Sequence, residues 1–155
     1  MIAVMNKPVL DPVSRVYLWM WGSMLLVLGV GSLLIHPDFG VGRHVTAEHL
    51  FGLFETNGWH GLAGGALGAI AVYSAWSGRW LRGVTLGVSV LGGIIPALLF
   101  LVSGDDSVAL RLIPVDATDA ITLHLLPGLV GLACVAADAL GRKRRTSILT
   151  TAMGG

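Results

Sequence analysis

The sequence is poor in charge, in cysteine and in catalytic motifs. Only 12% of its 155 residues are Asp, Glu, Lys or Arg, whereas soluble domains carry roughly 25%. The single cysteine, Cys134, excludes an intrachain disulfide and a CxxC motif, and a net charge of +1 gives no reason to expect a nucleic-acid partner. No phosphate-binding loop, dinucleotide fingerprint or nucleophile elbow is present. We therefore expect a protein that is not an enzyme and needs no cofactor.

Apolar residues and glycine take the place of charge. Hydrophobic residues make up 54% of the chain and 22 residues are glycine, and the mean hydropathy is +0.78. A membrane-spanning helix needs about 20 predominantly apolar residues. Four runs meet this requirement: residues 16–35, 57–76, 84–102 and 120–137. We predict an all-α, four-transmembrane-helix bundle over residues 16–138, preceded by a short segment at 1–15 and followed by a basic tail at 139–155.

The basic residues predict how this bundle is oriented. With four spans, eight of the ten Lys and Arg residues fall on the side of the two termini, and only Arg43 and Arg111 fall on the other. Cytoplasmic loops carry an excess of Lys and Arg. We therefore expect both termini in the cytoplasm and the protein as a multi-pass component of a bacterial plasma (inner) membrane.

Two segments outside the spans also carry expectations. Residues 46–55, "TAEHLFGLFE", are apolar enough to form a short helix in the outer membrane interface. We expect the tail "GRKRRTSILTTAMGG" to lack regular structure and to touch anionic lipid headgroups. Asp138 directly precedes this tail, and we expect its carboxylate to pair with the basic residues there.

A short motif occurs twice in the chain. The pattern acid-x4-His-x3-Gly is formed by Glu55, His60 and Gly64, and again by Asp119, His124 and Gly128. Both copies lie where a predicted span enters the membrane from outside. The chain therefore reads as two helical hairpins related by a parallel internal repeat.

Glycines follow both histidines at helical spacing. Residues three and four apart share a helix face, and small residues on such a face let membrane helices approach closely. We predict packing against other helices at Gly61, Gly64, Gly65, Gly68, Gly128 and Gly131.

Further polar and proline positions surround the two histidines. Asn57 is placed to cap the second span, because Asn side chains accept hydrogen bonds from the first backbone N–H groups of a helix. Pro127 removes one backbone donor and frees the carbonyl of Leu123 beside His124, and Pro96 predicts a kink in the third span. With Asn57, the polar residues expected at the outer ends of the spans are Glu55 and Asp119.

The two stretches that contain these histidines, "TNGWHGLAGGALG" and "DAITLHLLPGLVGL", carry a resemblance. They resemble a family of small four-helix integral membrane proteins that is common in actinobacteria and is classified as a domain of unknown function. The resemblance covers most of residues 16–138. It implies the fold and a bacterial inner membrane, and it implies no activity.

Several functions remain open at this stage. The leading hypothesis is a non-enzymatic accessory or scaffold subunit that packs its glycine-rich faces against other membrane protein subunits, or against further copies of itself, among membrane lipids. The alternative is a lipid-, quinone- or haem-binding protein that uses His60 and His124; these histidines can also simply fix helix register by hydrogen bonding. The spacing of His44, Glu48 and His49 is not that of a zinc site, so we expect no metal.

Overall fold

The computed structural model describes residues 11–41, 44–46, 48–51, 54–103, 108–109, 113–114 and 117–153. These residues contain four continuous helical segments. They are α1 (Pro12–Ile35), α2 (Gly58–Ser77), the run of α3 (Leu81–Ser89), η2 (Val90–Ile94) and α4 (Ile95–Ser103), and the run of α5 (Ala117–Asp119), η3 (Ala120–Leu125) and α6 (Leu126–Met153). The prediction of a helical fold is confirmed.

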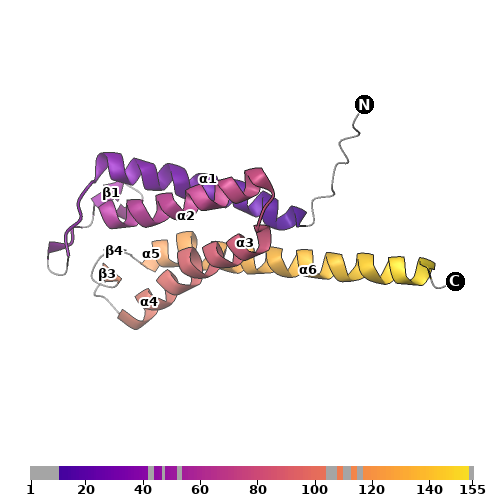
Figure 1. Ribbon diagram of the computed structural model, residues 1–155. Helices are drawn as coiled ribbons and strands as arrows, with labels where there is room; N and C mark the ends of the chain where they lie inside the picture. Colours follow the sequence, from indigo (N-terminus) through magenta and orange to yellow (C-terminus); the bar gives the residue numbers. More distant parts are fainter. Residues whose placement is uncertain are drawn as a thin grey trace, which may run out of the picture.

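The helices form two layers (Figure 1). α1 and α2 pack side by side in one layer, and the α3–α4 and α5–α6 runs form the other. α1 begins at the same end of the bundle at which α6 leaves it, and we call this the terminal end. The opposite end, which carries the β-strands, is the hairpin end.

Within the described residues, three stretches are long and apolar enough to cross a membrane. They are Pro12–Ile35, Leu81–Val102 and Ala117–Ser147. The helix α2 is not among them, because five of its 20 residues are glycine and contribute little apolar surface. Length and composition thus support a membrane protein, and a fourth crossing by α2 stays a prediction.

Glycine brings the helices of each layer together. A Cβ added to Gly22 of α1 would lie 2.6 Å from the Cβ of Ala71 in α2, and one added to Gly61 of α2 would lie 2.9 Å from the carbonyl oxygen of Gly29. In the other layer, a Cβ on Gly93 would lie 2.6 Å from the Cα of Gly128. Real Cβ atoms do not approach so closely, so larger residues here would push the helices apart.

The prediction of a short interfacial helix over residues 46–55 is wrong. The chain instead forms an antiparallel hairpin of β1 (Glu48–Leu50) and β2 (Phe54–Thr56), in which Glu48 faces Thr56 and Leu50 faces Phe54. Isolated helices of this length are marginal, whereas the hairpin leaves Leu50 only 2% exposed. A second antiparallel pair, β3 (Val108–Ala109) and β4 (Ile113–Pro114), lies at the same end.

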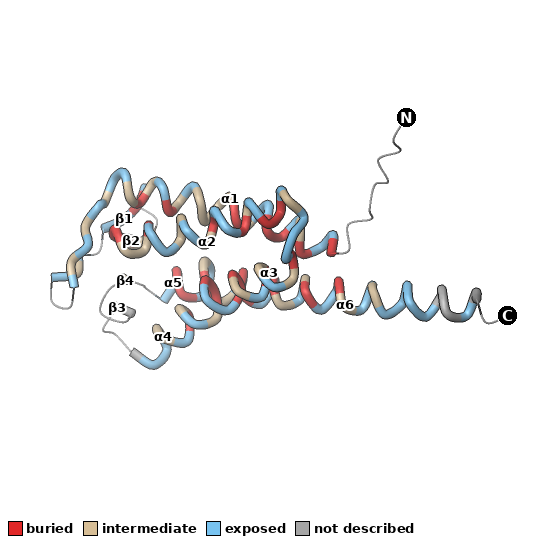
Figure 2. Tube along the Cα trace, viewed as in Figure 1, coloured by how far each residue is buried: buried red, intermediate tan, exposed pale blue. Residues whose placement is uncertain are grey.

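The tail also differs from expectation, because α6 continues as a helix to Met153. A helix that is already formed propagates at little cost per residue, and the sequence after Leu140 is rich in Arg and Lys, which favour helix. Figure 2 shows this extension leaving the bundle with mostly exposed residues, whereas the buried residues line the contacts between helices.

Paired polar groups hold the terminal end. Asp138 of α6 is 4% exposed and accepts hydrogen bonds from the backbone N–H groups of Val13, at 3.2 Å, and Ser14, at 2.8 Å. Asp138 therefore caps the first turn of α1, and the predicted pairing of Asp138 with the basic tail is wrong. The first N–H groups of a buried helix need acceptors, and Asp11, the N-cap residue, makes no side-chain cap of its own. Asp11 instead pairs with Arg142 at 2.8 Å.

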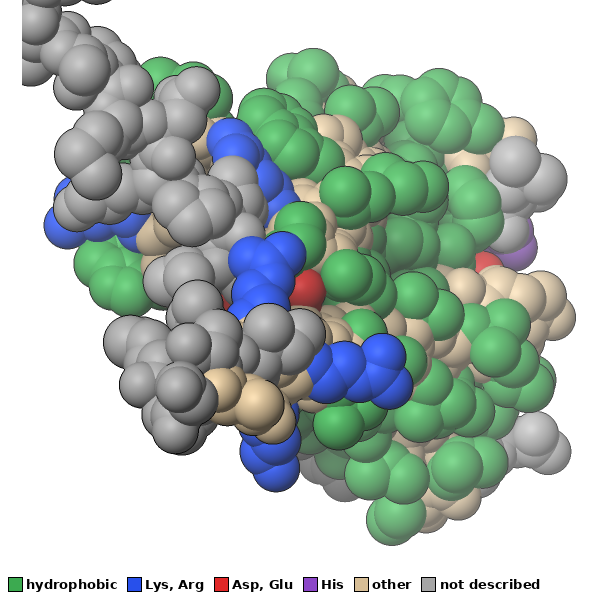
Figure 3. Space-filling model, turned by 90° about the vertical axis from the view of Figure 1, so that its right-hand side faces the viewer, with side chains coloured by type: hydrophobic (Ala, Val, Ile, Leu, Met, Phe, Trp, Pro, Cys, Tyr) green, Lys and Arg blue, Asp and Glu red, His purple; other side chains and the backbone are tan. Residues whose placement is uncertain are grey.

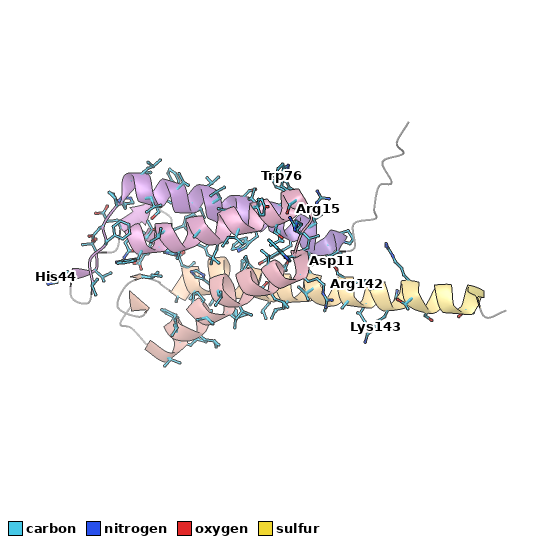
Figure 4. All side chains as sticks on the ribbon, in the orientation of Figure 1. Asp11, Arg15, His44, Trp76, Arg142 and Lys143 are labelled. Carbon is cyan, nitrogen blue, oxygen red and sulfur yellow. The ribbon has the colours of Figure 1, made fainter. Side chains whose placement is uncertain are left out.

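The same end holds the last turn of α2. The guanidinium of Arg15 donates to the carbonyl of Ala75 at 2.8 Å and to that of Trp76 at 3.5 Å. A cation at the carbonyl end of a helix is favourable. Figure 4 shows Asp11, Arg15 and Arg142 gathered at this end, with His44 at the far hairpin end.

Candidate functional site

The two histidines singled out by the repeated motif lie together at the hairpin end. The rings of His60, in the first turn of α2, and His124, in η3, are nearly parallel, with 5.8 Å between their centroids and 22° between their planes. Asn57 caps α2 as predicted, since its side chain accepts from the backbone N–H of His60 at 2.9 Å. Residues that are 64 positions apart in the sequence thus share one site.

The acidic residues of the two motifs meet beside them. The carboxylate of Asp119 accepts a hydrogen bond from the backbone N–H of Glu55 at 3.0 Å, and Asp119 is only 3% exposed. Asp119 of one motif copy contacts Glu55 of the other, and His60 of one copy stacks on His124 of the other. The two copies of the motif therefore face each other in space. Ser32 of α1 holds the start of α2 in place, because its hydroxyl hydrogen-bonds the hydroxyl of Thr56 and the carbonyl of Asn57.

A backbone carbonyl from another helix fixes the ring of His124. Its Nδ1 lies 2.8 Å from the carbonyl oxygen of Gly92 in η2. In an α-helix that oxygen would accept from the N–H of residue 96, which proline lacks. Pro96 therefore leaves the Gly92 carbonyl for His124. The predicted release of the Leu123 carbonyl by Pro127 stays a prediction; the bond that holds the ring crosses to the third helical segment.

Both proline segments share a local device. Each carries a π-helical turn immediately before its proline: the N–H of Ile95 bonds the carbonyl of Val90, and that of Leu126 bonds the carbonyl of Ile121. Such wide turns are rare and occur frequently at functional sites. The sequence could have identified Gly92. A proline frees the carbonyl four residues before it, and for Pro96 that residue is Gly92.

The ring of His60 is held by a residue close to it in the sequence, through a hydrogen bond to the backbone of Glu55. Each imidazole thus uses one nitrogen for a backbone contact. The other nitrogen, Nδ1 of His60 and Nε2 of His124, is buried and has no hydrogen-bond partner among the described residues. The side-chain Oε2 of Glu55 is in the same condition. Buried polar atoms without partners are uncommon and call for an explanation.

Two small cavities flank this histidine pair. The larger, about 160 Å³, lies toward α4 and has walls that include Leu67, Ile95 and Leu99. The smaller, about 50 Å³, lies toward α1 and is lined in part by Glu55. His60, His124 and Gly64 border both. The larger cavity is mostly apolar with two imidazoles at its edge, which is the usual composition of a small-molecule site.

The predicted packing glycines take different positions. Gly61 and Gly68 make close contacts with α1, Gly128 with Ser89 and Ile94, and Gly131 with Ser89 and Tyr17. Gly65 receives Gly29 of α1. Around Gly64, in contrast, an added Cβ would meet nothing nearer than 3.7 Å, because this residue borders the cavities. These faces therefore serve contacts within the chain.

The other histidines do not join the site. His36 forms an ion pair with Glu48, and His44 is exposed at the hairpin end. Within the described ranges, no three His, Cys, Asp or Glu side chains are grouped as a metal site requires. His60 and His124 are thus the candidate functional residues, with Glu55 beside them.

The fold and site define a class: a small helical protein with three helices long and apolar enough to cross a membrane and a pair of stacked histidines between its helices. Comparison with known families identifies it further. The chain belongs to the family described as domain of unknown function DUF4383, which matches residues 15–137. No curated protein and no solved structure matches the chain. The family resemblance inferred from the two motifs is thereby confirmed as a domain of unknown function.

Proposed function

We propose that this protein binds a small, lipid-soluble molecule through His60 and His124, and that the group it recognises is a hydroxyl that donates hydrogen bonds. The head group of a reduced quinone has this chemistry. The observation that carries the proposal is the pair of imidazoles, with His124 buried and His60 half-buried, each held through one nitrogen and with the other nitrogen buried and unpartnered.

The hydrogen-bonding direction follows from the anchors. A carbonyl oxygen only accepts, so the ring nitrogen facing Gly92, and likewise the one bonded to the Glu55 backbone, carries the proton. In a neutral imidazole the second nitrogen is then an acceptor. Two cationic rings with centroids 5.8 Å apart would repel each other in a medium of low dielectric constant. The pair therefore presents two acceptors and calls for a donor.

Size narrows the choice of ligand. Pockets for drug-sized ligands measure roughly 300–1,000 Å³, and the larger cavity here has about 160 Å³. A single aromatic ring or a hydroxylated head group fits this scale, with an apolar tail left among the helices or in lipid. Haem would require a far larger space between the imidazoles, so the volume favours the quinone over the haem alternative.

The test is direct binding. Purified protein in mild detergent is titrated, without oxygen, with a short-chain 1,4-benzohydroquinone, and binding is measured by isothermal titration calorimetry. We expect saturable binding that weakens about tenfold or more for the oxidised quinone, because the lost donors leave buried acceptors unpaired. His60→Leu and His124→Leu should each abolish it.

The matched control is His44→Leu, which removes an exposed histidine at the far hairpin end and should leave binding unchanged. Equal affinity for the wild type and a His60→Leu/His124→Leu double variant would overturn the proposal. Absence of saturable binding by any hydroquinone of this size would do the same.

A second candidate function, an accessory subunit of a larger membrane complex, is favoured by a different observation. The glycine faces first assigned to partner helices are occupied within the chain, but α6 extends beyond the bundle as an exposed basic helix. This extension is a surface for another subunit. If so, protein extracted in mild detergent should co-purify with a stoichiometric partner, and truncation after Gly141 should release it. A particle that contains this chain alone would contradict this function.

Both candidates assume the predicted topology, with the termini in the cytoplasm and the protein in a bacterial plasma membrane. The basic residues at the terminal end support it. Cysteine introduced at residue 106 should react with an impermeant label from outside the cell; protection there, with labelling only after lysis, would reverse the orientation.

A further inference from the structure

A long apolar groove, separate from the histidine site, lies between the first half of α1 and the first half of α6. Its volume is about 640 Å³. Its walls include Val13, Val16 and Met20 from α1 and Leu126, Val130 and Cys134 from α6. Several of these side chains are largely exposed, for example Met20 at 72% and Val130 at 54%. The groove is therefore open to whatever surrounds the bundle.

The length of the groove corresponds to one leaflet of a membrane. Its α1 wall runs from Pro12 to Trp21, which is about 14 Å at the rise of an α-helix. The hydrocarbon core of a bilayer is about 30 Å thick, so one leaflet contributes about 15 Å. The groove begins at the first turn of α1, so its length equals that of one leaflet measured from that turn.

The exposed charge at the start of the groove is basic. Asp11 and Asp138, the acidic residues there, are buried and bonded to Arg142 and to the first turn of α1. Beyond them on α6, residues 143–145, "KRR", are exposed. Figure 3 views the molecule from the terminal end and shows Lys and Arg side chains gathered around it, in front of a hydrophobic body.

We propose that this groove is a binding site for one anionic phospholipid of the leaflet at the terminal end. One acyl chain lies between α1 and α6, and the phosphate group lies beside the basic segment 143–145, nearest to Arg145, which shares the helix face of Cys134. Anionic lipids are attracted to basic segments that directly follow a membrane helix. Neither histidine lines the groove, so the failure of this site and that of the quinone site are distinguishable.

Native mass spectrometry tests the site with purified full-length protein. The protein is delipidated and then exposed to phosphatidylglycerol or phosphatidylcholine with identical acyl chains. We expect one phosphatidylglycerol to be retained, with a preference of about tenfold or more over phosphatidylcholine. Changing Lys143, Arg144 and Arg145 to Gln should bring the two lipids close to equal retention. Arg79→Gln, at an exposed arginine outside this cluster, is the control and should keep the preference.

A second variant tests the groove itself. Val130→Trp fills the groove and should reduce retention of either lipid by about tenfold or more. The reason is that part of the acyl chain can no longer be buried, and burying one apolar side chain corresponds to a change in affinity of about this size. Ile70→Trp, on a similarly exposed residue of α2 with 53% exposure, should not. Equal retention by Val130→Trp and wild type would overturn the site, and so would equal retention of the two lipids by the wild type.

Cys134 gives a readout that needs no substitution, because it is the single cysteine of the chain and lines the groove. Phosphatidylglycerol should slow its reaction with a lipid-soluble maleimide, and phosphatidylcholine should slow it less. Identical rates in both lipids would contradict the proposal. A dimer that forms without lipid and is lost in Val130→Trp would show that a second copy of the chain occupies the groove instead.

Discussion

The two ends of the bundle use their polar groups differently. At the terminal end, Asp138 caps α1, Asp11 pairs with Arg142, and Arg15 caps α2. At the hairpin end, each of two imidazoles is anchored through one nitrogen and unpartnered through the other. A group whose bonds are satisfied contributes to stability, whereas a group left unsatisfied costs stability and is retained for another reason. Among the described residues, buried atoms without a hydrogen bond also occur at the terminal end, at Oδ1 of Asp11, which has its ion pair with Arg142, and at the hydroxyl of Ser14. The histidine pair, however, has a cavity on either side. We therefore assign ligand binding to the hairpin end and stability to the terminal end.

The largest expected effect comes from breaking the terminal end. Asp138→Leu removes the acceptor of two backbone N–H groups at the start of α1. Because the donor of Ser14 would stay buried and that of Val13 part-buried without partners, we expect the free energy of unfolding to fall by about 2–3 kcal/mol. Chemical unfolding of the purified protein in detergent, followed by circular dichroism, measures this. Asp138→Asn keeps one acceptor oxygen and should lower the free energy of unfolding less. Equal stability of the wild type and both variants would contradict the structural role of Asp138.

Next in size is the contrast between two glycines of α2. A Cβ on Gly68 would collide with the backbone of Leu26, whereas a Cβ on Gly64 would meet nothing nearer than 3.7 Å. We expect Gly68→Ala to lower the free energy of unfolding by about 1–3 kcal/mol and Gly64→Ala to change it little. The same unfolding measurement compares them. A larger loss for Gly64→Ala than for Gly68→Ala would contradict the assignment of Gly64 to the cavity wall.

These contrasts show what the sequence could and could not predict. Helical periodicity and apolar length led to the helices, and the spacing from Asn57 to His60 led to the cap. The repeated motif led to both histidines, since residues with the same chemistry at the same helical depth can meet in a bundle. Their partners depend on contacts between segments: Asp138 could have paired with the adjacent basic tail, and only the packing of α1 on α6 brings the first turn of α1 to it.

The hairpin at residues 48–56 was missed for a related reason. Its strands are too short for a clear alternating pattern, and Leu50 is buried only because α1 covers it. The contact that holds the His124 ring could be predicted only in part. The rule that proline frees the carbonyl four residues earlier identifies Gly92, but the sequence alone does not show that this carbonyl faces the fourth helical segment.

A smaller effect is expected from Pro96→Ala. The restored N–H at residue 96 would compete with His124 for the carbonyl of Gly92. We expect the ring to be less firmly held and hydroquinone to bind about fivefold more weakly, which corresponds to roughly 1 kcal/mol for one hydrogen bond. The imidazole nitrogen shifts of His124 in solid-state NMR report the tautomer. Pro127→Ala changes the other proline but leaves residue 96 without an N–H, and serves as the comparison; identical spectra and affinities for both variants would contradict the anchoring role.

The central claim is that the histidine pair serves binding rather than stability. The most direct measurement compares the free energy of unfolding of the wild type, Asp138→Leu and the His60→Leu/His124→Leu double variant in the same detergent without ligand. The account predicts that the double variant stays within about 1 kcal/mol of the wild type, since lost interhelical hydrogen bonds in membranes are worth about 0.6 kcal/mol each and two unpartnered nitrogens disappear, while Asp138→Leu is strongly destabilised. A double variant destabilised as much as Asp138→Leu would show that the histidines are structural, and the binding site would then be abandoned.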